Sequence, residues 1–389
     1  MKKKLSIGII SLMILSFTGC SSFFLQEDEP VISEQNNGIA STEQSSEQNG
    51  FQVASVQRLT EGIVYDISSN GSELLVGTST YPSVDDQEQT ETSYINLGLY
   101  RFDTNQTNPL LETAKNQVNG ILDDANNGYY YLEFREEESE TGPYRLVWSD
   151  LDGSVTRNLS DSEESVSPVF SMYDKNRIIY GNQSGQVKLL QVSELKENRR
   201  IRTTTYQLSE NMPIDQIDYL PNEELAVFSS RNKESGTKDL YYAYLNGTSP
   251  EPVLVRENIR NFSLSPSSHT LLYTAGNGDN VPVLNAYDLR EDRTTTLYEG
   301  NVGVFRASPD GNVVFSERPD SSSTNQNLWI VDLEGNNLSQ IASNLNVAGN
   351  NIVFSPYRND LYLTVFSYAE NEEDSSEDIV FHIYQVTYE

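Results

Sequence analysis

Residues 304–342, VFRASPDGNVVFSERPDSSSTNQNLWIVDLEGNNLSQIA, alternate between short apolar runs and short polar turns. The apolar runs are rich in β-branched and aromatic residues and predict four strands, at residues 304–307, 312–316, 327–331 and 338–342. Ser308-Pro309-Asp310-Gly311 favours a tight turn between the first two strands, because proline fixes φ at its second position and Asp-Gly tolerates the reversal. A four-stranded meander of about 45 residues is typical of one β-propeller blade.

The same turn recurs along the chain. Aligned turns begin at Ser68, Asp123, Ser171, Leu220, Ser265, Ser308 and Ser355. Their mean spacing is about 48 residues, which is close to the length of a propeller blade. The sequence therefore predicts an all-β fold, a seven-bladed β-propeller of four-stranded antiparallel blades over residues 51–389.

The two ends of the repeated region complement each other. Residues 52–60 (QVASVQRLT) resemble a fourth blade strand without the three that should precede it, and the seventh repeat supplies only three strands before the chain ends. We expect the N-terminal strand to complete the last blade and close the ring, which removes free sheet edges.

The sixth repeat carries a family resemblance. Its Ser-Pro-Asp-Gly turn, the following Val-Val-Phe-Ser and the later Asn-Leu-Trp-Ile-Val-Asp-Leu-Glu-Gly resemble the WD40-like (PD40-type) repeat of TolB-like propellers in bacterial envelope proteins. The resemblance implies a propeller fold for residues 51–389. It does not imply the TolB function, because the α/β domain that precedes the propeller in that family has no counterpart here and the fold serves many functions.

Composition restricts the class of partner. The chain carries a formal charge of −31, or −34 without Lys2, Lys3 and Lys4. Such an acidic protein repels nucleic-acid phosphates and anionic headgroups, so nucleic acid is not an expected partner. A cationic ligand or a basic envelope protein is the partner that this charge favours.

The N-terminus predicts export and a lipid anchor. Residues 1–20 have a basic start, an apolar run from Leu5 to Phe17 that is too short to span a bilayer, and a Thr-Gly-Cys end that resembles the bacterial lipobox. Cys20, the single cysteine, is the expected acylation site. Residues 21–50 are polar and acidic and predict a disordered tether. We expect an extracytoplasmic protein anchored to the bacterial membrane, in the outer membrane if the cell has two; the alternative is an ordinary secretory signal.

Three predicted loops between second and third strands are strongly acidic, and they belong to blades that are consecutive in a closed ring. They contain Asp85, Asp86, Glu88 and Glu91; Glu136, Glu137, Glu138 and Glu140; and Glu370, Glu372, Glu373, Asp374, Glu377 and Asp378. One interpretation is a docking face for a cationic partner or a low-affinity site for a divalent cation such as calcium. The other is that these are solvated loop tips, as blocks of like charge usually are.

Catalytic signatures are not evident in the sequence. No nucleophile elbow, metal-ligand spacing or Gly-rich phosphate loop occurs, so neither a cofactor nor a metal is expected. Asp66, Asp218 and Arg306 lie on predicted innermost strands and should line the central channel. The carboxylates are candidates for catalysis, or they pair with Arg306 or with channel water.

These observations favour a lipid-anchored propeller with a monomeric head domain that binds a partner through loops on one face and does not catalyse a reaction. Two alternatives from other classes stay open. An envelope-protein assembly factor would show an exposed apolar patch or a free strand edge. A glycan-acting hydrolase or lyase would use carboxylates at the channel mouth.

Overall fold

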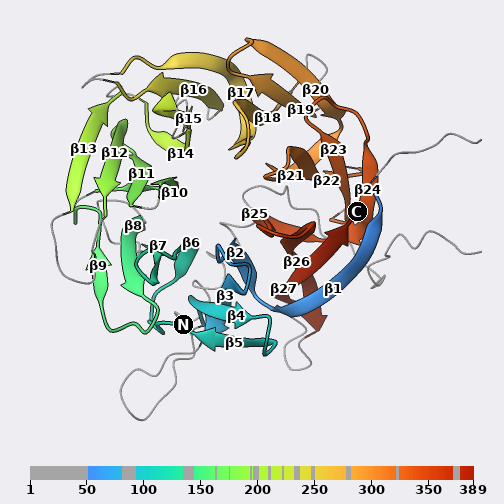
Figure 1. Ribbon diagram of the computed structural model, residues 1–389, viewed down its shortest axis with the longest axis horizontal. Coiled ribbons are helices and arrows are strands. Elements are labelled where there is room, and N and C mark those ends of the chain that lie inside the picture. Colours follow the sequence, from blue (N-terminus) through green and yellow to red (C-terminus); the bar gives the residue numbers. More distant parts are fainter. Residues whose placement is uncertain are drawn as a thin grey trace, which may run out of the picture.

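The computed structural model describes residues 51–80, 93–134, 144–162, 164–174, 176–192, 195, 201–208, 212–220, 223–231, 237–246, 250–276, 282–320, 324–370 and 377–389. This part of the chain forms six antiparallel sheets, five of four strands and one of seven, arranged around a central axis (Figure 1). The prediction of an all-β chain built from four-stranded antiparallel sheets is confirmed. No helix in the described part is long and apolar enough to cross a membrane.

The sheets follow one another in chain order. The first contains β2 (Ile63–Ile67), β3 (Glu73–Thr80), β4 (Tyr94–Arg101) and β5 (Gln106–Pro109). The second contains β6 (Gln117–Asp123), β7 (Gly128–Phe134), β8 (Tyr144–Asp150) and β9 (Thr156–Asn158). The third contains β10 (Val166–Asp174), β11 (Arg177–Asn182), β12 (Gln186–Gln191) and β13 (Arg202–Gln207).

The second half of the chain continues the arrangement. The seven-stranded sheet contains β14 (Ile214–Leu220), β15 (Leu225–Arg231), β16 (Lys238–Tyr244), β17 (Val253–Leu264), β18 (Thr270–Gly276), β19 (Pro282–Asp288) and β20 (Arg293–Glu299). The next contains β21 (Asn301–Ala307), β22 (Asn312–Arg318), β23 (Gln326–Asp332) and β24 (Ser339–Leu345). The last contains β25 (Val347–Phe354), β26 (Asp360–Glu370), β27 (Glu377–Tyr388) and β1 (Val53–Glu61).

The sixth repeat folds as its sequence predicts, with longer strands. Its four predicted strands correspond to β21–β24, and Ser308 N–H donates to Asn312 O at 2.7 Å across the first turn. In the third repeat the predicted turn at Ser171 is wrong. There Ser171 pairs with Ile179 inside the ladder, and β10 continues to Asp174, which pairs with Arg177 of β11. The turn therefore follows Asp174.

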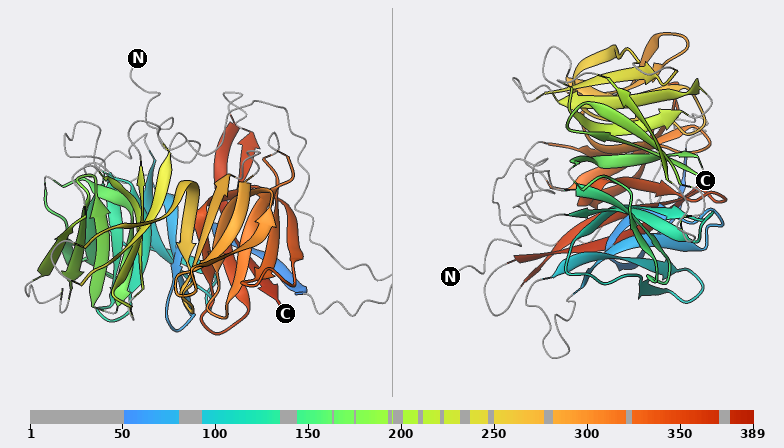
Figure 2. Two further views of the ribbon diagram at one scale, coloured as in Figure 1. Left: turned by 90° about the horizontal axis from the view of Figure 1, so that it is seen from above. Right: turned by 90° about the vertical axis from the view of Figure 1, so that its left-hand side faces the viewer.

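Two strand pairings link units of the fold to one another. The first half of β17 pairs with β16 and its second half with β18, from Ile259 onward, so a single strand serves two four-stranded units. β1 pairs antiparallel with β27 from Val53↔Tyr388 to Glu61↔His382, so the first and last described strands lie side by side. The strands run along the axis of the ring, as the edge-on views in Figure 2 show.

Apolar side chains fill the spaces between neighbouring sheets. The described residues form seven buried clusters, one of them between the two halves of the seven-stranded sheet. Packing is close enough to require glycine at some contacts: a Cβ on Gly181 would lie 2.3 Å from Ile214 Cγ2 of the next sheet. The core is therefore distributed around the ring, and the axis is lined by the first strand of each unit.

Candidate functional site

Polar side chains connect the innermost strands to one another around the axis. Asn119 Nδ2 donates to the carbonyl of Pro168, Ser167 Oγ donates to the carbonyl of Ile214, and Gln216 Nε2 donates to Phe262 O at 2.9 Å. In each pair the partners lie on first strands of successive units. These hydrogen bonds join the inner strands of successive units to one another.

Asp66 lies on β2, Asp218 on β14 and Arg306 on β21. Asp66 Oδ2 accepts a hydrogen bond from Leu122 N–H of the next sheet at 2.8 Å. Asp218 Oδ1 accepts from Ser171 Oγ at 2.8 Å and from Tyr219 N–H at 2.8 Å. Both carboxylates thus accept hydrogen bonds that join innermost strands of neighbouring sheets.

The environment of the two carboxyl groups changes their acidity. Burial raises the pKa of Asp66 to about 6, although backbone N–H donors and the charge of Arg306 act in the opposite direction. Burial also raises the pKa of Asp218, against the opposing effects of Arg306 and of its hydrogen bonds. The charge of Arg306 therefore acts on both carboxyl groups. Within the described residues, however, Arg306 forms no ion pair with Asp66 or Asp218.

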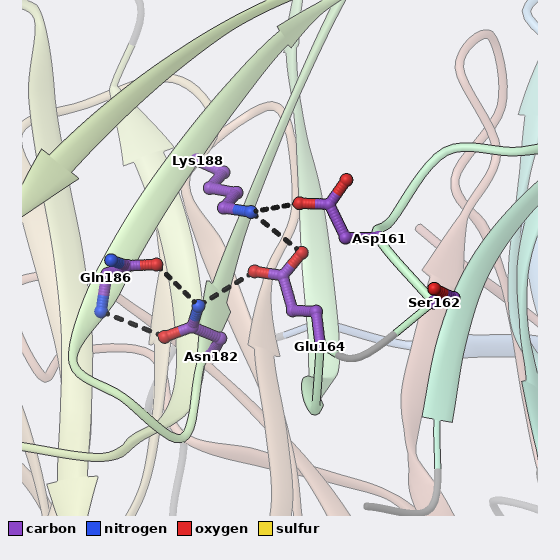
Figure 3. A pocket seen from close by; sticks show the side chains of 6 residues that line it. All are labelled: Asp161, Ser162, Glu164, Asn182, Gln186 and Lys188. Carbon is purple, nitrogen blue, oxygen red and sulfur yellow. Dashed lines mark hydrogen bonds and ion pairs between the residues drawn. The ribbon is translucent and has the colours of Figure 1, made fainter. Parts of the chain in front are cut away.

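A polar hollow of about 420 Å³ lies beside the third sheet (Figure 3). It is lined by Asp161, Ser162 and Glu164, which precede β10, by Asn182 at the end of β11, and by Gln186 and Lys188 of β12. Lys188 Nζ lies 2.9 Å from Asp161 Oδ2 and 3.0 Å from Glu164 Oε2. Asn182 Nδ2 donates to Glu164 Oε1 at 2.7 Å and to Gln186 Oε1 at 3.0 Å.

We call these connected side chains the Lys188 network. Within it, Glu164 joins Lys188 to Asn182. It is 8% exposed and also accepts a hydrogen bond from Tyr180 Oη at 2.8 Å. Burial lowers the pKa of Lys188, but its hydrogen bonds to Asp161 and Glu164 and their charges outweigh that effect and raise it. The amine is held protonated, so this hollow can offer charge and hydrogen bonds to a ligand, whereas a proton-abstracting base would need a lowered lysine pKa.

Sequence reasoning did not find the Lys188 network. Its two carboxylates lie 24 and 27 residues from the lysine and share no motif with it, and only the pairing of β11 with β12 and the path of the chain before β10 bring them together. A buried lysine within an apolar strand, Val187-Lys188-Leu189-Leu190, is the one signal that could have indicated a charged partner.

The other predicted sites have different outcomes. Cys20 and most residues of the three acidic loops lie outside the described residues, and of Glu370, Glu377 and Asp378 only the pairing of β26 with β27 is described. Both histidines have partners: His269 Nδ1 lies 3.0 Å from Glu223 Oε1, and His382 Nε2 lies 2.9 Å from Ser367 Oγ. The described residues contain no group of three or more His, Cys, Asp or Glu placed to hold a metal ion.

Comparison with known proteins identifies the fold. No protein-family model matches the chain, and no curated protein matches it in sequence. An oligogalacturonate lyase in complex with manganese is similar in structure, with a TM-score of 0.60 and 14% identity over 87% of this chain and 95% of that chain. The beta-propeller domain of Cps50 (Swd1) from Myceliophteria thermophila gives a TM-score of 0.54 and 12% identity over 85% and 98%.

Two further solved structures are among those that match the chain. A chain of the mitotic checkpoint complex has a TM-score of 0.54 and 11% identity over 89% of this chain and 98% of that chain. TolB from Acinetobacter baumannii has a TM-score of only 0.43 at 15% identity, over 83% of each chain, which is too low to carry an argument. At these identities the likeness defines the fold alone: the chain is a β-propeller.

Proposed function

We propose that the ring has seven blades and that β1 closes it. Counting the seven-stranded sheet as two units that share β17 gives seven, and each of the seven core clusters then fills one space between blades. β1 would complete the blade of β25–β27, because its whole length pairs with β27.

We further propose that this propeller is the head of a lipid-anchored, extracytoplasmic protein that binds a cationic protein partner and does not transform it. One observation carries the proposal: the strands that flank the three acidic loops belong to three neighbouring sheets. β2 packs against both β25 and β6, so the sheet of β25–β27 lies beside that of β2–β5, which lies beside that of β6–β9 (Figure 1).

The strand ends next to these loops support the same arrangement. The last paired residues before each loop are Thr80↔Tyr94, Phe134↔Tyr144 and Glu370↔Glu377, at corresponding ends of second and third strands. Fourteen acidic residues attached to one sector would create a strong negative potential, which speeds association with a basic partner and fixes its orientation.

Charges elsewhere fit a binding role. Lys188 is kept protonated by its carboxylates, and the channel carboxylates accept hydrogen bonds that connect inner strands. Arg231 and Lys238 both pair with Asp215, at 3.5 and 2.5 Å, so part of the positive charge across from the acidic sector is neutralised within the fold.

The test is a pull-down from envelope extract with the full-length chain in detergent. The first variant changes the acidic residues of one loop, Asp85→Asn, Asp86→Asn, Glu88→Gln and Glu91→Gln. Its matched control removes the same charge from exposed positions elsewhere, with Glu251→Gln, Glu257→Gln, Glu291→Gln and Glu334→Gln. We expect a basic protein that is retained by the wild type and by the control and is lost from the loop variant. Equal retention by all three would contradict the proposal.

A role in envelope-protein assembly is the second candidate, and a different surface favours it. Three apolar side chains are exposed at the end of β16 and the start of β17: Tyr244 (47%), Val253 (43%) and Leu254 (47%). The outer strands β13 and β20 carry mostly polar residues instead. Exposed apolar side chains on an outer strand are typical of an interaction surface. A Val253→Thr, Leu254→Ser variant in the same pull-down separates the two: loss of a membrane protein from this variant alone would favour assembly.

A further inference from the structure

Arg318, the last residue of β22, has an unusual environment. Its Nε is buried without a hydrogen-bond partner, and burial lowers the pKa of the guanidinium. Within the described residues no carboxylate pairs with it, in a chain whose formal charge is −31. A buried N–H donor is normally hydrogen-bonded, because a donor without a partner loses its hydration without compensation.

An unsatisfied acceptor lies next to it. Gln326, the first residue of β23, is 3% exposed, and the pairing Glu317↔Asn327 places Arg318 and Gln326 next to one another at the ends of their strands. Gln326 Nε2 donates to Val347 O at 3.0 Å, which fixes the orientation of the amide. Its Oε1 is buried and receives no hydrogen bond.

The backbone of Gly303 lies close to this acceptor. A Cβ on Gly303 would lie 2.9 Å from Gln326 Oε1 and 2.7 Å from Ser316 Oγ, so only glycine lets these two side chains lie against the backbone here. Gly303 is itself exposed.

Two more polar atoms at the same end of the sheet are buried without partners. They are Thr324 Oγ1, two residues before Gln326, and Asn346 Oδ1, which follows the Gln326↔Leu345 pair. All four residues thus lie at one end of the β21–β24 sheet, next to the start of β25. We call Arg318, Thr324, Gln326 and Asn346 the Arg318 cluster.

We propose that the Arg318 cluster is a binding site for a small hydroxy- or amino-carboxylic acid. A carboxylate matches the planar fork of a guanidinium and accepts two parallel hydrogen bonds from it. A hydroxyl or ammonium group on the same ligand supplies the donor that Gln326 Oε1 lacks. A simple anion satisfies the arginine only, and a neutral sugar satisfies the amide only, so the cluster selects ligands that carry both groups. This site is separate from the acidic sector and does not depend on the proposed partner.

Calorimetry with the full-length chain in detergent tests the proposal. The probes are D-glucuronate and L-alanine, which carry both groups, acetate, which lacks the donor, and D-glucose, which lacks the carboxylate. We expect one of the first two to bind with a Kd of about 1 mM or tighter, and acetate and D-glucose at least about tenfold more weakly. Arg318→Met should weaken binding by at least about tenfold, Arg318→Lys by less, and the exposed control Arg293→Met not at all.

Melting temperatures without ligand separate lost binding from lost folding. Arg318→Met should melt at or above the wild-type temperature, because it removes a buried N–H donor that has no partner; a lower melting temperature would mean that this donor is already satisfied in the free protein and would overturn the proposal. So would the absence of binding by D-glucuronate and L-alanine up to about 10 mM, or undiminished binding by the variant. Equal binding of sulfate and D-glucuronate would indicate an adventitious ion only.

Discussion

At the scale of single residues, Asp66 should make stability depend on pH. Its pKa rises from 3.8 to about 6 in the fold, so the folded chain binds this proton more tightly than the unfolded chain does. The resulting stabilisation is complete below about pH 4 and is lost as pH rises through 6. We expect Asp66→Asn, which keeps an oxygen for Leu122 N–H, to be more stable than wild type at pH 7.5 by about 1–3 kcal/mol and to lose that advantage toward pH 4.

Urea denaturation of both proteins at several pH values measures this difference. Effects of the other carboxylates cancel in the comparison, because both proteins carry them. A difference in unfolding free energy that stays constant between pH 7.5 and 4 would show that Asp66 titrates normally.

Lys188 and Glu164 should be strongly coupled. Lys188→Met leaves Glu164, whose side chain is 6% exposed, without its cation and should destabilise the fold by about 3 kcal/mol. Adding Glu164→Gln removes the stranded charge and should recover most of that loss, since the amide still bonds to Tyr180 and Asn182. Chemical denaturation of the two single variants and the double variant gives the coupling energy. A double variant that is less stable than either single variant would mean that the residues act independently.

At the scale of elements, β1 should matter far more than the segment before it. β1 pairs with β27 over its whole length, and Phe51 and Val56 pack against the core cluster at this position. Deleting residues 51–60 exposes the edge of β27 and should lower the melting temperature by many degrees, whereas deleting residues 22–50 should change it little. Differential scanning calorimetry of both deletions decides the point. Small and equal effects would show that β1 does not close the ring.

The strands could be predicted from sequence because their signals are local. Val313-Val314-Phe315 and Leu328-Trp329-Ile330 are apolar runs next to turns that contain Gly311 and Gly335, whose φ values of 90° and 83° only glycine adopts easily. The turn at Ser171 failed because the third repeat lacks both glycine and proline at that point, and β10 extends to Asp174. Strand ends are decided by hydrogen bonds to a partner strand, which local composition does not encode.

At the scale of the whole molecule, some candidate sites could be predicted from local sequence and others depend on the assembled fold. Asp66, Asp218 and Arg306 were predicted to share the channel because each occupies an equivalent place before its turn, and the fold brings them within electrostatic range. Arg318 and Gln326 were not singled out, although they lie only eight residues apart. What distinguishes them is the lack of a partner for buried atoms, and that property exists only once the neighbouring strands are in place.

The anchor is the remaining whole-molecule prediction. If Cys20 is acylated, the full-length chain should partition into the detergent phase of a Triton X-114 extract, because each buried CH₂ contributes about 0.8 kcal/mol to membrane binding. Cys20→Ala should move to the aqueous phase and lose incorporation of labelled palmitate. Its melting temperature should not change, since the described fold begins at residue 51. A wild-type protein that stays in the aqueous phase would make residues 1–20 an ordinary secretory signal, and the binding head would then act as a released protein.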